Sequence, residues 1–351
     1  MRLTPFSKFL LVLAIVVGLF FLIKHFLPSS EVSQDATSTT TEQTIPDAAP
    51  AEQQGNATSP TQPEKPSSNT SSSTAKFYYT PTPPTNGQIY GVVQMGAESF
   101  DYFAVNIDND LNWEVKGGEW GTSFVKDGMA TPANIREKLA LAIQDLINKY
   151  GVSGKKIHFL ISSGAAKEAI TTTIKAELSK MGYFINTVTP EKEGIYAYEA
   201  VVPKEFRDNS FMVDIGSGNT KISWIKNGKR QGLESYGSKY YLDKTPDNIV
   251  KKDMITKTSQ VPADMRTTCF MLGGVPFTFA KKIRTDKSER YTVLASPQNT
   301  KAEGPKETAG LNIYTGLVEG SKCDNFVFDW KGSYSIGFLM ELHQQQTRKA
   351  K

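Results

Sequence analysis

The chain has 351 residues and a formal net charge of +4, so it is long enough for two domains but lacks the strongly basic balance expected of a nucleic-acid-binding protein. The charge is unevenly spread: residues 1–28 carry +3 and residues 29–76 carry −4, which leaves +5 on residues 77–351. This mild positive charge suits a small anionic ligand. With three histidines in the chain, a histidine-based zinc site is disfavoured as well.

The first 28 residues predict a membrane anchor. With Lys24 snorkelling to the surface, Phe9–Pro28 matches the roughly 20 residues that a helix needs to cross a bilayer. Arg2 and Lys8 precede this stretch, and after it no basic residue appears until Lys65. The positive-inside rule then predicts a single-pass protein of the inner (cytoplasmic) membrane, with its N-terminus inside and its C-terminal domain periplasmic or otherwise extracytoplasmic. A cleaved signal peptide is the alternative, and it exports the same remainder.

Residues 29–76 predict a disordered linker. They are rich in Ser, Thr, Pro, Gln and Ala and hold almost no large apolar side chain. Such a segment cannot offset its ordering entropy by burial. The folded part of the chain is therefore expected to begin at residue 77.

Strands and helices alternate along the rest of the chain. Apolar and β-branched runs predict strands at 88–95, 101–107, 156–162, 184–188, 267–272 and 325–330, and a hairpin at 211–228. Helical spacing and cap residues predict helices at 132–150, 191–200 and 334–344, one that stops near 182 and one that begins near 276. Residues 228–266 are polar and carry no clear pattern. The alternation predicts an α/β fold with mixed sheets.

The hairpin at 211–228, FMVDIGSGNTKISWIKNG, has a second version earlier in the chain. Without gaps, Val93–Val105 aligns with Val213–Ile225, and Gln94 falls on Asp214. The turns then pair Gly96 with Gly216, Ala97 with Ser217 and Ser99 with Asn219. Two similar hairpins predict two similar lobes, at 77–205 and 206–351, with their turns facing each other across a cleft. An ordinary hairpin turn is the alternative explanation for the glycines.

The two hairpins resemble the phosphate-binding loops of the Ppx/GppA (exopolyphosphatase and guanosine pentaphosphate phosphohydrolase) family, which read roughly DLGSNS and DIGGGSTE. Residues 161–169, ISSGAAKEA, look like that family's T-S-A-L-R-E-A segment, and residues 271–280, MLGGVPFTFA, resemble its later glycine-rich turn. Residues 187–201, TVTPEKEGIYAYEAV, resemble its S-G-x-E-E-A segment. The resemblance implies two actin-like (ribonuclease H-like) lobes and removal of terminal phosphate from a polyphosphate-like chain.

The resemblance also implies roles for individual residues. Glu193 falls on the family's catalytic carboxylate, and Asp214 on a ligand for Mg²⁺, a cation that takes carboxylates, waters and substrate phosphates. Glycines in the turns let backbone N–H groups converge on phosphate oxygens, and we expect Gly216 to use a positive φ. The predicted phosphate-binding residues are Gly96, Ala97, Glu98, Ser99, Ser163, Lys167, Gly216, Ser217, Gly218, Asn219 and Thr220, and Gly273 and Gly274 form the ligand-side turn.

Three positions depart from the family pattern. Gln94 replaces an aspartate, Lys221 stands where the second loop normally ends in glutamate, and Lys167 replaces an arginine. Loss of carboxylates weakens a metal site, and lysine favours an anion. Two functions stay open: a tethered phosphoanhydride hydrolase, or a catalytically degenerate actin-like binding or assembly module with a protein partner in the cell envelope. The sequence does not fix the oligomeric state.

Both cysteines, Cys269 and Cys323, belong to the part predicted to be exported. An oxidising compartment permits a disulfide between them. If the family architecture holds, the strand of Cys269 lies next to the segment that starts at Cys323.

Overall fold

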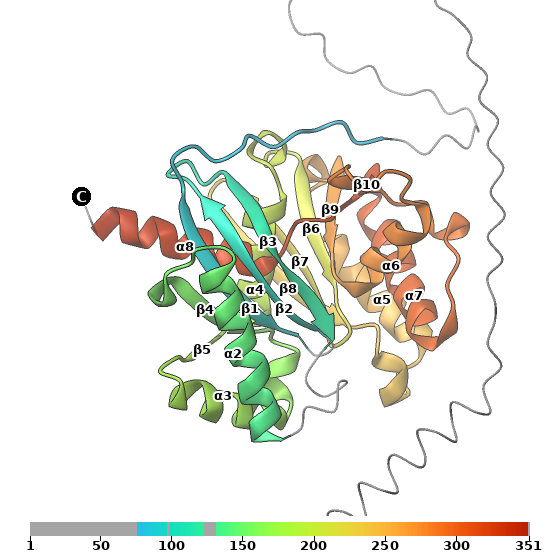
Figure 1. Cartoon of the computed structure of the whole chain (residues 1–351). Helices are drawn as coiled ribbons and strands as arrows, with labels where there is room; N and C mark the ends of the chain where they lie inside the picture. Colours follow the sequence, from blue (N-terminus) through green and yellow to red (C-terminus); the bar gives the residue numbers. More distant parts are fainter. Residues whose placement is uncertain (1–75, 97–98, 123–130, 350–351) are drawn as a thin grey trace, which may run out of the picture. The chain divides into compact units, whose positions relative to one another are not determined.

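The computed structural model describes residues 76–96, 99–122 and 131–349, which form two mixed β-sheets with their helices (Figure 1). The predicted anchor and nearly all of the predicted linker lie outside these residues. Within the described ranges, no helix has the length and apolar character needed to cross a membrane.

The first sheet has the strand order β3-β2-β1-β4-β5. β1 is antiparallel to β2 and parallel to β4, and β2 is antiparallel to β3. Its strands are β1 (Gln88–Met95), β2 (Ser99–Ile107), β3 (Trp113–Thr122), β4 (Ile157–Ile161) and β5 (Ile185–Thr187). The helices of this half are α2 (Pro132–Asn148), α3 (Ile170–Lys180) and α4 (Pro190–Val201).

The second sheet has the order β10-β11-β9-β6-β7-β8. Its strands are β6 (Ser210–Ile215), β7 (Asn219–Lys226), β8 (Lys229–Tyr236), β9 (Thr268–Leu272), β10 (Tyr291–Val293) and β11 (Asn325–Asp329). Its helices are α5 (Asp247–Thr258), α6 (Gly274–Ile283), α7 (Gly304–Ser321) and α8 (Tyr334–Lys349). Short 3₁₀ turns lie between these elements.

The two sheets repeat one topology. Read from the other end, β8-β7-β6-β9-β11 follows the same order as β3-β2-β1-β4-β5, with β10 added at the edge. The hairpins β1–β2 and β6–β7 thus occupy equivalent places, as the aligned sequences predict. Each half ends in a helix, α4 in the first and α8 in the second. These two helices pack against each other, and α8 also contacts β1 and β2. The duplication is therefore confirmed in the strand order, while the boundary at 205/206 stays a prediction.

Local sequence explains where helices start. Thr131 precedes α2, and its side chain accepts a hydrogen bond from the Asn134 N–H, as expected of an N-cap. Thr189 does the same for the Lys192 N–H at the start of α4. Both helices carry proline in their first turn, where its missing N–H costs nothing.

Five elements were not predicted: β3, β8, α5, β10 and α7. The sequence of β8, KRQGLESY, is polar because this strand lies at the sheet edge and its first half is exposed. α5 buries three of its twelve residues, so its apolar stripe is too thin for a clear helical period. Residues 228–266, read as irregular, therefore contain an edge strand and a helix.

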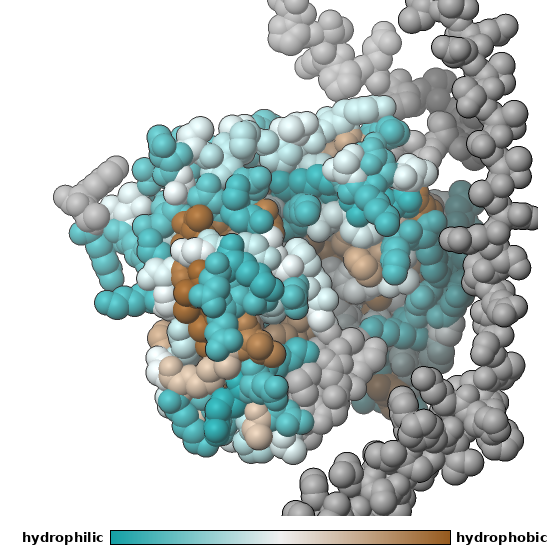
Figure 2. Space-filling view, viewed as in Figure 1, coloured by the Kyte–Doolittle hydropathy of each residue, from teal (hydrophilic) through white to brown (hydrophobic). Residues whose placement is uncertain are grey.

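The first sheet is covered on both faces. Along β1, Tyr90 and Val92 face the core shared with α4, α8 and the second sheet, whereas Val93 and Met95 face the core under α2 and α3. This alternation is the two-residue period of a strand. Figure 2 shows one face of the molecule, on which hydrophilic residues cover most of the surface and hydrophobic residues appear in small groups between them.

The expected neighbourhood of the cysteines is confirmed, but the disulfide is not formed. β9 pairs in parallel with β11, and Cys269 lies opposite Phe326, three residues after Cys323. Both cysteines are buried free thiols, and each sulfur contacts a different backbone carbonyl, that of Phe270 or of Asn325. Burial raises the pKa of both thiols, that of Cys323 to about 12.

Candidate functional site

A buried lysine joins the two predicted catalytic carboxylates. Lys221 Nζ lies 2.7 Å from Glu193 Oε1 and 3.3 Å from Asp214 Oδ2. The side chains of Lys221, Glu193 and Asp214 are 5%, 2% and 12% exposed. The structure thus brings Glu193 and Asp214 together, as the motifs predict, but with an ammonium between them.

The backbone explains this convergence. Asp214 on β6 lies directly opposite Lys221 on β7, and opposed residues of antiparallel strands point to the same face. Glu193 comes from the first turn of α4, which packs on β7. The next residue is Gly194, where a Cβ atom would lie 2.2 Å from Ser223 Oγ. Glycine is therefore required for α4 to approach β7 closely enough for the ion pair.

The second oxygen of Glu193 is engaged as well. Glu193 Oε2 accepts a hydrogen bond of 2.8 Å from the Ser163 N–H. The hydroxyl of Ser163 accepts one of 3.1 Å from the Asn219 amide, which also donates to Glu234 at 2.7 Å. Since Ser163 follows β4 and Asn219 begins β7, this network ties the first sheet to the second. A carboxylate with both oxygens held in this way is poorly placed to take a proton from water.

Burial and charge act in opposite directions on this group. Burial raises the pKa of Asp214, and repulsion from Glu193 adds to it, while Lys221 lowers it. For Lys221, burial lowers the pKa, but attraction to Asp214 and Glu193 outweighs burial, so the pKa is raised. Lys221 therefore stays protonated, and a proton is taken up more readily by Asp214 than by an exposed aspartate.

The start of α8 completes the centre, which sequence reasoning missed. Tyr334 is 5% exposed, and its hydroxyl has no hydrogen-bond partner among the described residues. Burial raises the pKa of Tyr334, and the negative charges of Glu193, Asp214 and Asp101 raise it further. The tyrosine therefore lies near all three carboxylates. On the other side, the Ser333 hydroxyl donates to Gln94 Oε1 at 2.6 Å. No motif marked this tyrosine, since it is the first residue of an ordinary amphipathic helix.

The turn of the second hairpin presents free backbone donors. Ser217 is half-buried and Gly218 exposed, and neither N–H donates to an acceptor among the described residues. The carbonyls of Gly216 and Ser217 accept hydrogen bonds from the N–H groups of Ser238 and Lys239. The loop is thereby fixed from behind, while two consecutive donors stay available at its tip.

Tight packing, not backbone conformation, accounts for Gly216, while Gly218 is in ordinary contact with the loop after β4. The expected positive φ at Gly216 is wrong, because neither it nor Gly218 is in the left-handed region. A Cβ on Gly216 would lie 3.0 Å from the Asn219 carbonyl oxygen, and one on Gly218 would lie 3.4 Å from Cα of Gly164. The loop after β4 therefore packs directly against this turn.

The other predicted binding residues have different surroundings. The Thr220 hydroxyl donates to the Tyr236 carbonyl, so the side chains of Asn219 and Thr220 are used within the protein. Gly273, at a φ of +99°, lies against Asp214, since a Cβ there would be 2.5 Å from Oδ1. Gly274 begins α6 and Lys167 is exposed.

In the first turn, the Gly96 N–H donates to the Ser99 carbonyl. Ala97 and Glu98 lie outside the described residues, so the facing of the two turns stays a prediction.

A divalent metal does not fit this centre. The three ranges that the structure describes contain no group of three or more His, Cys, Asp or Glu side chains that could hold a metal ion. Mg²⁺ requires oxygen ligands near 2.1 Å in octahedral geometry. Here the Lys221 ammonium already lies against Asp214 and Glu193, the carboxylates that would serve it. The predicted Mg²⁺ site at Asp214 is therefore not supported.

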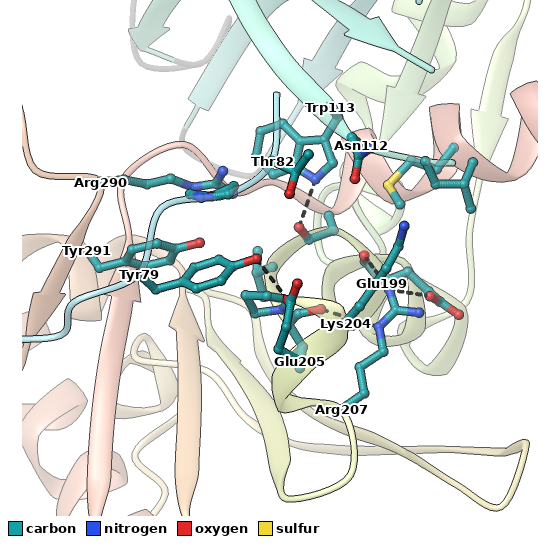
Figure 3. Close-up of a pocket in the computed structure, with 17 residues that line it drawn as sticks. Tyr79, Thr82, Asn112, Trp113, Glu199, Lys204, Glu205, Arg207, Arg290 and Tyr291 are labelled. Atoms are coloured by element: carbon teal, nitrogen blue, oxygen red, sulfur yellow. Dashed lines mark hydrogen bonds and ion pairs between the residues drawn. The ribbon is translucent and has the colours of Figure 1, made fainter. Parts of the chain in front are cut away.

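A cavity of about 60 Å³ lies elsewhere, lined by the segment before β1 and the end of α4 (Figure 3). In it the Arg290 guanidinium stacks 4.2 Å from the centre of the Trp113 ring and pairs with Asp329, and the Tyr79 hydroxyl donates to Glu205. A larger groove of about 540 Å³ runs between residues 76–81 and 283–293. None of the predicted catalytic or phosphate-binding residues lines either cavity.

The fold matches that of known exopolyphosphatases. A Ppx/GppA family member from Aquifex aeolicus is 16% identical, with a TM-score of 0.52, over 74% of this chain and 99% of that one. An exopolyphosphatase from Cytophaga hutchinsonii is 13% identical, with a TM-score of 0.54, over 73% and 97%. An exopolyphosphatase-like protein is 12% identical, with a TM-score of 0.53, over 74% of this chain and 98% of that one. The described part of the chain thus has the two-sheet, actin-like α/β fold of these proteins.

Sequence comparison adds no closer relative. No protein-family profile matches the chain. No curated protein matches it either.

Proposed function

We propose that the chain binds a phosphorylated anion at the tip of the β6–β7 turn and does not hydrolyse it. The observation that carries this proposal is the ion-paired centre, in which Lys221 holds the expected base Glu193. The fold is that of proteins whose names describe polyphosphate hydrolysis, and the free N–H groups of Ser217 and Gly218 are suited to oxyanions.

Hydrolysis is the second candidate, because Glu193 and Asp214 do meet below the turn. Three features argue against it. Glu193 has both oxygens engaged, the centre does not fit Mg²⁺, and Gln94 supplies a neutral amide where the family has an acid. Binding needs none of these groups to react.

The test is titration of the full-length chain with pyrophosphate by calorimetry, combined with an assay for released orthophosphate. Gly218→Val fills the space beside Gly164 and should weaken binding at least about tenfold, equivalent to 1.4 kcal/mol or more. Gly154→Val is the matched control, because a Cβ at Gly154 meets only the Tyr183 hydroxyl, at 3.6 Å. Equal affinity of Gly218→Val and wild type would refute the site. Steady orthophosphate release by wild type would establish the hydrolase instead.

We also propose that Phe9–Pro28 anchors the protein in the inner membrane, with residues 77–351 outside the cytoplasm. The support is the apolar stretch and the basic residues before it. Protease added to intact spheroplasts should digest the C-terminal part, and that part should stay with the membrane during carbonate washing. Protection from the protease would contradict this orientation, and release by the wash would indicate a cleaved signal.

A further inference from the structure

We infer that the Lys221 ammonium is the permanent cation of this centre and occupies the place that a divalent metal would need, so that ligand binding requires no metal. This inference rests on the proposed function for its ligand arm only. Its metal arm concerns the centre itself and can be decided without any ligand.

The position of the Lys221 side chain is set by strand pairing. Strand pairing fixes residue 221 opposite Asp214, so a side chain there must point at the carboxylate. The ammonium also lies close to the first glycine of the turn, because a Cβ on Gly216 would be 3.8 Å from Lys221 Nζ. A positive charge is therefore placed next to the turn that contains the free N–H groups of Ser217 and Gly218.

The Lys221 ammonium and a metal ion would compete for the same two carboxylates. An ammonium has three N–H donors, and here two of them go to Glu193 and Asp214. A metal ion would need the same two carboxylates and would bring its charge next to Lys221, whose side chain is only 5% exposed. Like charges at such a short distance repel strongly where water is excluded. Cation and metal are thus mutually exclusive at this position.

The groups around the centre are consistent with a fixed cation. The Ser163 N–H stabilises the far oxygen of Glu193, and Gly273 at the start of α6 lies against the far oxygen of Asp214. Glu193 is thus held on one side by a backbone N–H and on the other by Lys221, whereas Asp214 is paired with Lys221 and packed closely against Gly273.

The test has a metal arm and a ligand arm, both on the full-length chain. In the metal arm, binding of Mn²⁺ is followed by electron paramagnetic resonance for wild type, Lys221→Glu and Lys229→Glu. Lys229→Glu is the matched control, with the same charge change at the exposed start of β8. We expect one tight Mn²⁺ site in Lys221→Glu, because this variant has three carboxylates where wild type has two carboxylates and an ammonium. We expect no such site in wild type or in Lys229→Glu. A rise in the thermal midpoint of Lys221→Glu with Mn²⁺ is the companion readout.

Tight Mn²⁺ binding by wild type would overturn the inference, and this measurement decides it even if Lys221→Glu does not fold. A folded Lys221→Glu that binds no Mn²⁺ would also count against it, since the lysine would then not be what excludes the metal. In the ligand arm, wild-type affinity for pyrophosphate should agree within about threefold between EDTA and excess MgCl₂. Binding only with Mg²⁺ contradicts the inference. Absence of binding in both buffers contradicts the proposed function alone and leaves the metal arm to decide.

Discussion

The two hairpins differ in the charges of one pair of residues that face each other at equivalent positions. In β1–β2, Gln94 lies opposite Asp101; in β6–β7, Asp214 lies opposite Lys221. In the second pair, the acid has a cation beside it. In the first, burial raises the pKa of Asp101 to about 6, because only the Ser99 side chain and the Gly121 backbone offset the cost. The two sheets thus share one topology, while the acid of one hairpin is paired with a cation and the acid of the other is buried without one and has a raised pKa.

This difference bears on the proposed absence of hydrolysis. A hydrolytic centre needs carboxylates that are free to bind a metal or take a proton. Asp214 is not in that state, because it is paired with Lys221, and Asp101 has only the neutral Gln94 opposite it on β1. Both hairpins keep a glycine at the start of the turn, Gly96 and Gly216.

The largest expected effect comes from removing the cation. Lys221→Met leaves Glu193 and Asp214 buried without a partner, and breaking a buried ion pair in this way costs about 3–5 kcal/mol. Chemical denaturation at pH 7 should show a loss of unfolding free energy in this range. The loss should shrink toward pH 5 as Asp214, whose pKa is raised by burial, takes up a proton.

Neutralising the carboxylates provides the control. Adding Glu193→Gln and Asp214→Asn to Lys221→Met should restore more than half of the lost stability, because no uncompensated charge then remains buried. If the triple variant is as unstable as Lys221→Met, packing and not charge explains the loss.

The first hairpin should respond with the opposite pH dependence. Asp101 has an ordinary pKa of 3.8 and a folded pKa of about 6, so the folded state binds the proton more tightly and its stability falls as pH rises through this window. Asp101→Asn removes this effect. Relative to wild type, the variant should gain up to about 3 kcal/mol of unfolding free energy between pH 4 and pH 7. A difference that does not change with pH would show that Asp101 is ionised normally.

The smallest effect is expected on the same strand as the largest. Lys226 pairs with Asp264 at 2.7 Å, but both side chains are exposed, by 39% and 62%, and exposed pairs contribute little. Lys226→Met should leave the denaturation midpoint unchanged within error. A loss comparable with that of Lys221→Met would mean that removal of any lysine from β7 destabilises the fold, so burial would not explain the contrast.

The fold was largely predictable where one face of an element is clearly apolar. β1, β2 and the N-cap of α2 were found because their periods and cap residues are distinct. β8 and α5 were missed, since an edge strand and a thinly buried helix carry mostly polar residues. The duplicated hairpin was visible because it is local in sequence.

The site was only half predictable. Glu193 and Asp214 were marked by motifs, and Lys221 was recognised as a departure, but its contact with Glu193 depends on how α4 approaches β7 at Gly194. Tyr334 reaches the centre because α8 folds back onto α4. Such contacts depend on packing between distant segments, which spacing within one motif does not encode.

The most direct test is a crystal structure of the full-length chain grown with Mn²⁺ and pyrophosphate, examined by anomalous scattering. The account predicts Lys221 Nζ within hydrogen-bonding distance of Glu193 and Asp214, no Mn²⁺ peak between them, and intact pyrophosphate on the N–H groups of Ser217 and Gly218. A Mn²⁺ peak at these carboxylates, with the Lys221 side chain displaced, would contradict it.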